Sequence, residues 1–136
     1  MKNKIEYLNP DGLPKSPAFS QVVTTQGNGK IIYVGGQDAV NPLGETIGKG
    51  DLAAQTKQVM LNLQTALSAC GATLDNLVKL TIYVVPEQDL HSGFLAAHEF
   101  FGKLAHPPVI SVLVVAGLAH PDFLVEIEAI AFVPEA

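Results

Sequence analysis

The sequence predicts a small α+β domain in which two helices pack on one face of a sheet. Short β-rich runs lie toward both ends of the chain. Apolar residues recur at helical spacing in residues 52–70 and 89–104, and residues 77–85 alternate as a half-buried strand does. A chain of 136 residues has room for one core, so residues 1–136 are expected to form a single domain.

Charged side chains are scarce and form no patch. They make up 15% of the chain, against about a quarter in an average globular domain, and 13 acidic and 8 basic residues give a net charge of -5. The basic residues are spread singly, which disfavours nucleic acid and anionic membranes as partners. No apolar run approaches the roughly 18 residues of a membrane span, and residues 1–9 lack a signal-peptide core. We therefore expect a soluble, cytoplasmic protein.

The first third of the chain predicts an irregular arm followed by a hairpin. Residues 9–17 are dense in turn formers. Residues 20–25 and 30–34 are β-rich, and Gln26-Gly27-Asn28-Gly29 between them favours a tight turn because Asn and Gly tolerate positive φ. The following pair, Gly35 and Gly36, indicates either a β-bulge or a place where a ligand or second chain approaches the backbone.

Residues 45–47 can form only a short edge strand before the first helix. Asp51 predicts the N-cap of that helix and Gly71 its C-terminal cap. Cys70, which ends the apolar pattern, is expected to be a small core residue rather than a nucleophile, and a lone cysteine excludes an internal disulfide. The apolar stripe of the second helix, residues 89–104, consists of Leu90, Phe94, Ala97, Phe101 and Leu104.

The strand over residues 109–115 is apolar on both faces, and only Ser111 interrupts it. A strand of this kind needs cover on both faces. Two single-striped helices can cover one face, so we expect a second subunit to cover the other. Ser111 has no histidine nearby in the sequence, which favours an interior hydroxyl over a nucleophile.

The last strand, residues 124–133, carries two carboxylates on one face. Glu126 and Glu128 are two residues apart, so their Cα atoms are expected to be about 7 Å apart. One of them can serve a catalytic site, or both can remain solvated at the rim of a subunit interface. The sequence leaves these alternatives open.

Other catalytic signatures are missing from the sequence. His91 and His98, seven residues apart on the second helix, are too distant to ligate one metal by themselves. No phosphate loop, nucleophile elbow or dinucleotide fingerprint is present. We therefore expect neither a metal nor a cofactor.

Four segments together resemble the RidA (YjgF-type) family. They are Phe19-Ser20-Gln21, Gly35-Gly36-Gln37, Gly71-Ala72-x-Leu74-Asp75-Asn76-Leu77-Val78-Lys79 and Leu124-Val125-Glu126-Ile127-Glu128-Ala129. The resemblance covers residues 15–133 and implies a chorismate-mutase-like fold with a mixed sheet of about six strands. It also implies a homotrimeric barrel with three intersubunit clefts. For the best-known members it implies hydrolysis of 2-imino or 2-aminoacrylate acids to 2-keto acids and ammonia.

The resemblance also implies which residues line the cleft. Family deaminases bind the substrate carboxylate with an arginine in a Pro-x-Arg-Ser motif, because the planar guanidinium pairs bidentately with a carboxylate. Ile110 stands at that position here. Phe19 replaces a tyrosine, Phe94 a cleft asparagine, and Val112 a small or polar residue. Each of these changes removes a polar group.

Two cleft residues align intact with the family pattern. They are Glu126, the acid that the resemblance implies positions the attacking water, and Gly36, which presents its backbone. A lone carboxyl among Phe, Ile and Val is desolvated, which disfavours its charged form and suits it to proton transfer. His106 and His120 are further candidates by position, and the loop over residues 117–122 is one residue longer than usual.

Two functions remain open from the sequence. The first is hydrolytic deamination, or related acid/base chemistry, on a small imine, enamine or enol, with Glu126 as the acid/base. The second is a non-catalytic trimer that binds a small apolar ligand or a protein partner in its clefts. An older label for relatives, endoribonuclease L-PSP, is disfavoured by the acidic balance and the lack of a basic stripe.

Overall fold

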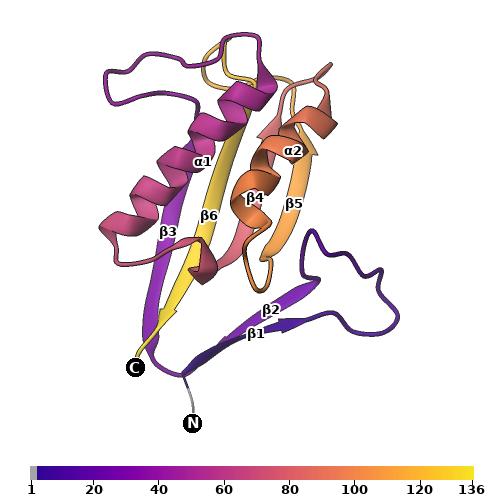
Figure 1. Cartoon of the computed structure of the whole chain (residues 1–136), viewed down its shortest axis with the longest axis vertical. Helices are drawn as coiled ribbons and strands as arrows, with labels where there is room; N and C mark the ends of the chain where they lie inside the picture. The colour runs from indigo at the N-terminus through magenta and orange to yellow at the C-terminus, as the bar shows by residue number, and fades with distance from the viewer. Residues whose placement is uncertain (1–2) are drawn as a thin grey trace.

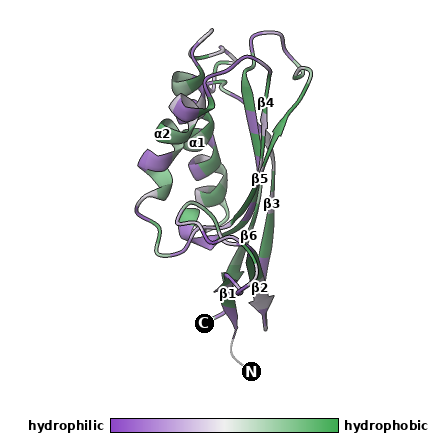
Figure 2. Cartoon of the chain, turned by 90° about the vertical axis from the view of Figure 1, so that its right-hand side faces the viewer, coloured by the Kyte–Doolittle hydropathy of each residue, from purple (hydrophilic) through white to green (hydrophobic). Residues whose placement is uncertain are grey.

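The computed structural model describes residues 3–136 and confirms an α+β architecture of two layers (Figure 1). Both helices cover the same face of the main sheet, as the side view shows (Figure 2). The helices are α1 (Leu52–Ala69) and α2 (Leu90–Phe101), with a short 3-10 turn, η1 (Leu74–Asn76), between them. The strands are β1 (Lys4–Leu8), β2 (Val22–Gln26), β3 (Gly29–Gln37), β4 (Leu77–Val84), β5 (Val109–Val114) and β6 (Val125–Pro134).

The main sheet is mixed and has β6 at its centre. Its order is β3-β6-β4-β5, in which β6 runs antiparallel to both of its neighbours and β4 runs parallel to β5. Strands β1 and β2 form a separate antiparallel pair. Along β6 the buried residues Val125, Ile127 and Ala129 alternate with the half-buried Glu126 and Glu128. The period of two therefore places the two glutamates on the face opposite the helices.

The predicted hairpin between residues 20–25 and 30–34 is wrong. The chain does turn at Gly27, whose φ is +83°, but β2 pairs with β1 and β3 pairs with β6. The Asn3 side chain accepts a hydrogen bond from the backbone N–H of Asn28 at 2.7 Å, so the turn is held by the N-terminal segment. Strand β1, which the sequence analysis did not predict, takes the hydrogen bonds that the hairpin would have used.

The predicted ends of the helices are confirmed, apart from the last turn of α2. Asp51 caps α1 by accepting a hydrogen bond from the backbone N–H of Ala54 at 3.1 Å, and Gly71 follows the helix with a φ of +74°. Helix α2 ends at Phe101, three residues before the predicted end at residue 104. The expected edge strand over residues 45–47 is reduced to a single bridge between Val40 and Thr46.

The core lies between α1 and the sheet, whereas α2 packs mainly on α1. Val59, Met60, Leu63 and Leu67 of α1 are completely buried. No residue of α2 is fully buried, although Phe101 packs against the core, so its apolar stripe is only partly covered. A Cβ atom at Gly93 would lie 3.1 Å from a methyl carbon of Leu52, so glycine allows the two helices to approach closely. Neither helix is long and apolar enough to cross a membrane in residues 3–136.

Strand β5 is an exposed edge strand in the single chain. Val112 and Val114 are 56% and 61% exposed, and Leu113 on the opposite face is 44% exposed. Ser111 is also exposed in the single chain, and the prediction of an interior hydroxyl depends on cover from a second subunit. The reason is that no layer covers the open face of the sheet, while α2 stands away from the other face. The cover that these apolar side chains need is therefore missing within one chain.

Buried Gln55 ties α1 to the loops at its N-terminal end. Its side-chain amide donates to the carbonyl oxygens of Gly48 at 3.2 Å and Asp122 at 2.8 Å. Its carbonyl oxygen accepts from the backbone N–H of Leu124 at 2.9 Å. The start of β6 is thus anchored directly on α1.

We expect Gln55→Leu to destabilise the protein by about 2–3 kcal/mol, because three backbone groups lose their partner in a buried position. Urea denaturation measures this loss. Gln64→Leu, an exposed position on the same helix, is the matched control and should shift stability by less than about 0.5 kcal/mol. Equal effects of the two substitutions would contradict the anchoring role.

Candidate functional site

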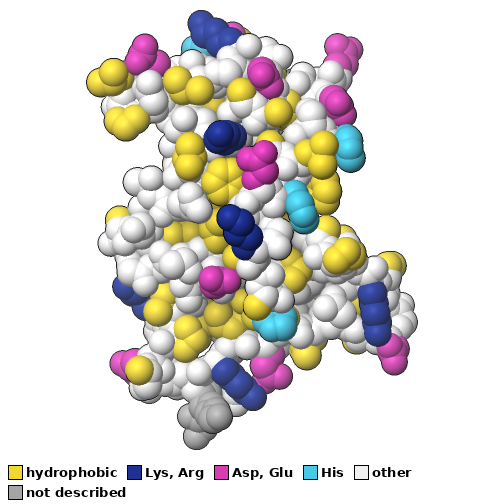
Figure 3. Space-filling view, viewed as in Figure 1, with side chains coloured by type: hydrophobic (Ala, Val, Ile, Leu, Met, Phe, Trp, Pro, Cys, Tyr) yellow, Lys and Arg dark blue, Asp and Glu magenta, His cyan; other side chains and the backbone are white. Residues whose placement is uncertain are grey.

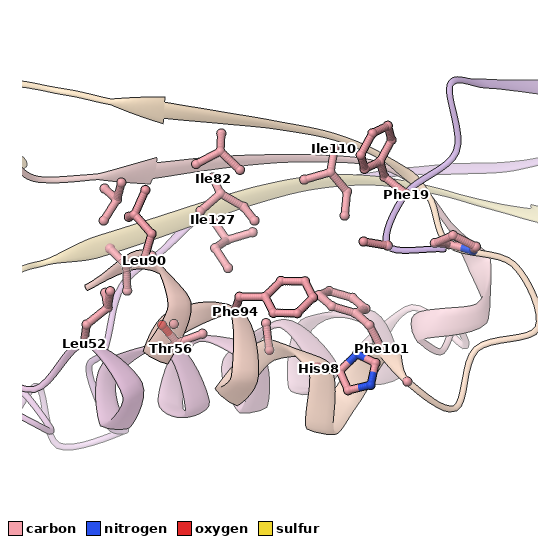
Figure 4. A pocket seen from close by; sticks show the side chains of 18 of the residues that line it. Phe19, Leu52, Thr56, Ile82, Leu90, Phe94, His98, Phe101, Ile110 and Ile127 are labelled. Atoms are coloured by element: carbon pink, nitrogen blue, oxygen red, sulfur yellow. The ribbon is translucent and has the colours of Figure 1, made fainter. Parts of the chain in front are cut away.

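A cavity of about 650 Å³ lies between α2 and the helix-covered face of the sheet. Figure 4 shows Phe94 and Phe101 on the α2 side of this space, opposite Ile82, Ile110 and Ile127 on the strands. The polar side chains among its lining residues are Thr56 and His98. The space exists because α2 rests on α1 and directs its apolar stripe toward the sheet without reaching it.

Four of the residues that the sequence analysis selected meet in this cavity: Phe19, Phe94, Ile110 and Val112. Ile110 and Val112 pair in register with Leu80 and Ile82 of β4, which directs them to the helix side of the sheet. Phe19 is placed by its neighbour Ser20. The Ser20 hydroxyl donates to the carbonyl oxygen of Pro107 at 2.6 Å, and its backbone N–H donates to that of Pro108 at 3.0 Å.

The other two selected residues, Glu126 and Gly36, lie on the opposite face of the sheet. Glu126 pairs with Tyr83 of β4, while its neighbours Val125 and Ile127 are buried beneath the helices. A Cβ atom at Gly36 would overlap the Glu126 carboxylate, so a larger residue here would require that side chain to move. The expectation of a lone carboxyl among Phe, Ile and Val concerns a cleft between subunits, so it stays a prediction. The sheet itself separates Glu126 from the apolar cavity.

Two further acid/base groups, Asp38 and Tyr83, accompany Glu126, and the sequence analysis missed both. The Tyr83 hydroxyl donates to a carboxylate oxygen of Glu128 at 2.5 Å. This hydrogen bond raises the pKa of Tyr83, and desolvation and the charges of Glu128 and Glu126 raise it further. The open face thus carries a cluster of acidic groups around Glu126.

Asp38 reaches this cluster because the strand register shifts at the two glycines. Val34 pairs with Ala129, but Gln37 pairs with Ile127, so one extra residue of β3 lies between these pairs. Without that residue, Asp38 would be directed to the helix side. The bulge that Gly35 and Gly36 indicated is therefore confirmed, and it is the signal from which the position of Asp38 could have been found.

The pKa of Asp38 is raised to about 7. Burial is the largest cause, followed by a hydrogen bond with Glu126 and by the charge of Glu126. Within residues 3–136, no lysine or histidine forms an ion pair with this group. The observed pairs are Lys4–Glu6, Lys15–Asp11, Lys49–Asp122 and His120–Asp122. Among the described residues, Asp38 therefore has no ion-pair partner.

The histidine candidates lie elsewhere. The ring of His106 stacks on Tyr7 with centroids 4.9 Å apart, and His120 packs on Phe123 at 5.1 Å. Neither lines the cavity, whereas His98 of α2 does. His98 lies one helical turn after Phe94, on the side that the apolar stripe indicated. Helical periodicity could therefore have identified it.

Comparison with known proteins agrees with this fold. The family model described as Endoribonuclease L-PSP matches residues 13–133. A RutC family protein of Pyrococcus abyssi is 36% identical over 97% of this chain and 98% of its own length. A 3-aminoacrylate deaminase, RutC of Acinetobacter baylyi, is 29% identical over 94% of this chain and 98% of its own. The crystal structure of YyfB from Yersinia pestis, a Rid family protein, superposes with a TM-score of 0.85. Its identity is 34%, over 95% of this chain and 98% of that one.

These likenesses define an α+β protein of the YjgF, chorismate-mutase-like kind, with six strands and two helices. The chain belongs to the Rid/YjgF/L-PSP (RutC) family.

The raised pKa of Asp38 predicts a specific dependence of stability on pH. An unfolded carboxyl has a pKa of 3.8, so between about pH 4 and pH 7 the folded state binds more protons than the unfolded state. The free energy of unfolding should therefore fall as the pH rises through this window. Asp38→Asn should weaken this fall, so its stability relative to the native sequence should be greater at pH 8 than at pH 4.5.

Urea denaturation at both pH values measures the difference. Asp11→Asn is the matched control, since the Asp11 side chain is 99% exposed. The assignment is contradicted if the stability difference between the Asp38 variant and the native sequence is the same at both pH values.

Proposed function

We propose that this protein catalyses hydrolytic deamination, or related acid/base chemistry, on a small imine, enamine or enol that carries no carboxylate. Glu126 is the acid/base, and the cavity around Phe94 and Ile110 binds the apolar part of the substrate. Gly36 provides the close backbone approach beside Glu126. The observation that carries this proposal is the apolar wall of the cavity in a family that includes a deaminase.

The exclusion of carboxylate substrates rests on the absence of arginine. The resemblance to RidA deaminases places a carboxylate-binding arginine where this chain has Ile110. The sequence contains no arginine at any position, so a second copy of the chain could not supply one either. No lysine lines the cavity, and His98 is the lining residue that can carry a positive charge. A substrate carboxylate would therefore lose its hydration here without a strong partner.

A complete site requires two chains in this proposal. Glu126 and the cavity lie on opposite faces of one sheet, so they can face a common space only when the open face of one subunit meets the cavity of another. The exposed apolar side chains of β5 and of the open face, such as Val112 and Tyr33, support such a contact. The homotrimer with intersubunit clefts that the family resemblance implies would satisfy this requirement.

The proposed hydrolysis needs one proton acceptor and one proton donor near the imine carbon. As the water oxygen bonds to that carbon, Glu126 accepts a proton from the water and the C=N electron pair moves to nitrogen, which takes up a proton. The C–N bond then breaks as Glu126 returns its proton to the amino nitrogen and the hydroxyl group loses its proton, which releases ammonia and leaves a carbonyl product. Water and imine are consumed, and no cofactor is needed.

A second function, non-catalytic binding of a small apolar ligand, is favoured by one observation. Within the described chain, the cavity holds no carboxyl group, and its polar lining side chains are Thr56 and His98. If the neighbouring subunit does not bring Glu126 to the cavity, the site binds without reacting. In that case Glu126 is a hydrogen-bond acceptor within the assembly.

Glu126→Gln separates these two functions. Small imines of ketones and aldehydes without a carboxylate are supplied as substrates, and ammonia release is measured by a coupled assay. We expect kcat to fall about 10²–10⁴-fold in the variant, because general acid/base catalysis of that size is lost. Glu99→Gln, on an exposed position of α2, is the matched control and should leave kcat unchanged.

Native mass spectrometry shows whether the variant keeps the oligomeric state of the native sequence. Unchanged turnover in an intact Glu126→Gln assembly would eliminate the catalytic role of Glu126. Apolar ligand binding without any turnover by the native sequence would establish the non-catalytic alternative.

Ile110→Arg tests the exclusion of carboxylates. An arginine here enters the cavity from β5 and can pair with a carboxylate, so we expect affinity for small 2-keto acids to increase at least about 10-fold. Isothermal titration calorimetry with 2-oxobutanoate measures the gain, and Ile110→Met is the uncharged control of similar size. No gain in a folded Ile110→Arg protein would mean that Phe19 and Phe94 also close the pocket to carboxylates.

A further inference from the structure

The Asp38 carboxyl lies against Glu126 on the open face of the sheet, and the proposed function does not yet use it. The antiparallel register that pairs Gln37 with Ile127 places Asp38 opposite Glu126 on this face. One carboxylate oxygen of Asp38, Oδ1, is shielded from solvent and receives no hydrogen bond from any donor in residues 3–136. A buried acceptor without a donor is costly, so this arrangement requires an explanation.

The backbone around Asp38 is held in place by α1. The side-chain amide of Asn62 donates to the carbonyl oxygens of Asp38 and Val40, each at 2.9 Å. The backbone N–H of Val40 also donates to the carbonyl oxygen of Asp38 at 2.8 Å. On the other side of the pair, the missing side chain of Gly36 leaves the position of the Glu126 carboxylate free. The contact between the two carboxyl groups is therefore built by the fold on both sides.

The groups around this pair cannot supply the missing donor. Tyr83 of β4 donates its hydroxyl to Glu128, and Glu128 of β6 adds a negative charge. Lys79 borders the same hollow as Glu128 but forms no ion pair with either carboxyl of the Asp38–Glu126 pair among the described residues. Helix α1 presents the neutral amide of Asn62, which is occupied by backbone carbonyls. A proton held by the pair itself would be such a donor.

We propose that Asp38 is a positioning residue for Glu126, and that the two carboxyl groups hold one proton between them at neutral pH. Two ionised carboxylates in contact repel each other, and one shared proton converts this repulsion into a hydrogen bond. This inference rests on the proposed function only for the acid/base role of Glu126. The sharing of the proton rests on the register that places Asp38 opposite Glu126 and on the shielded Oδ1 of Asp38.

A pair with one proton can perform both proton transfers of the proposed hydrolysis. Glu126 delivers the proton of the pair to the imine nitrogen from one carboxyl oxygen and takes a proton from the attacking water with the other, so the proton count of the pair is unchanged. When the C–N bond breaks, the pair accepts the hydroxyl proton and delivers its own to the departing nitrogen, which leaves as ammonia. Asp38 keeps Glu126 oriented and supplied with a proton, and does not itself touch the substrate.

Carboxyl-carbon NMR tests this inference without reference to any substrate. Protein labelled with ¹³C at the side-chain carboxyl carbons of Asp and Glu is titrated as the native assembly. We expect a carboxyl resonance with a midpoint near pH 7, in keeping with the raised pKa of Asp38, and expect it to be lost in Asp38→Asn. Asp11→Asn should retain it, because Asp11 lies in an exposed loop.

Glu126→Gln provides a second variant, since it removes the other half of the pair and should also abolish the resonance that titrates near neutral pH. The inference is overturned if the native sequence has no such resonance, or if the resonance persists in either variant.

The kinetic readout distinguishes this inference from the proposed function. If both hold, Asp38→Asn should change the pH dependence of kcat while leaving KM close to its original value, because Asp38 does not line the cavity. A titration near neutral pH that disappears in Asp38→Asn, together with turnover indifferent to Glu126→Gln, would keep the shared proton and eliminate the proposed function. Loss of turnover in Glu126→Gln, without any such titration in the native sequence, would keep the proposed function and eliminate the shared proton.

Discussion

The central position of β6 is the constraint on which the rest of this structure depends. Because β6 is hydrogen-bonded to β3 on one side and to β4 on the other, the pairing fixes which face of the sheet each of its side chains occupies. Val125, Ile127 and Ala129 must fill the layer beneath the helices, which leaves Glu126 and Glu128 for the open face. A slip of one residue would bury two carboxylates and expose the core, so this register is strongly determined.

The functional groups are divided between the two faces of the sheet, so association of two chains would bring the cavity of one next to the acid/base groups of the other. The cavity offers apolar walls without a carboxyl group, and the open face offers acid/base groups without a cavity of comparable size. Burial of large apolar side chains such as Val112 and Val114 contributes about 1.5–3 kcal/mol each when it is complete. Charged side chains are spread singly over the helix-bearing face (Figure 3), so that face has no basic patch to attract nucleic acid. The exposed apolar strand and the split site therefore favour the same kind of partner, a second copy of the chain.

The sequence was sufficient where structure depends on local chemistry. Asp51 and Gly71 end α1 as predicted because a cap involves only the few residues next to it. The alternation of β6 was predictable for the same reason. The hairpin failed because its turn is local but the pairing of β2 is decided by competition with β1, which lies earlier in the chain. The position of Asp38 was missed because one extra residue at the glycine pair reverses which side of the sheet it faces.

The apolar stripe of α2 shows a different limit of sequence reasoning. A stripe such as that of Phe94 and Phe101 indicates which side of a helix is shielded from water. A protein core and a ligand cavity can both provide that shielding. Sequence periodicity therefore could not reveal that α2 rests on α1 and leaves a space above the sheet. For the same reason, four cleft residues could be selected by resemblance, although their separation from Glu126 by the sheet could not be foreseen.

The energetics of Asp38 argue that its carboxyl serves chemistry rather than folding. A carboxyl whose pKa is raised to about 7 holds its proton more tightly in the folded state, so its ionisation above that pH opposes folding. An asparagine in the same position could donate to Glu126 at every pH without this loss of stability. A group that costs stability at neutral pH is expected where proton transfer near neutral pH is useful. Proton transfer matters more in an apolar cavity. Negative charge that develops on a substrate nitrogen is poorly stabilised there, so it must be neutralised by a proton from a neighbouring acid. The apolar wall and the one-proton carboxyl pair are in this way complementary requirements of one reaction on an uncharged substrate.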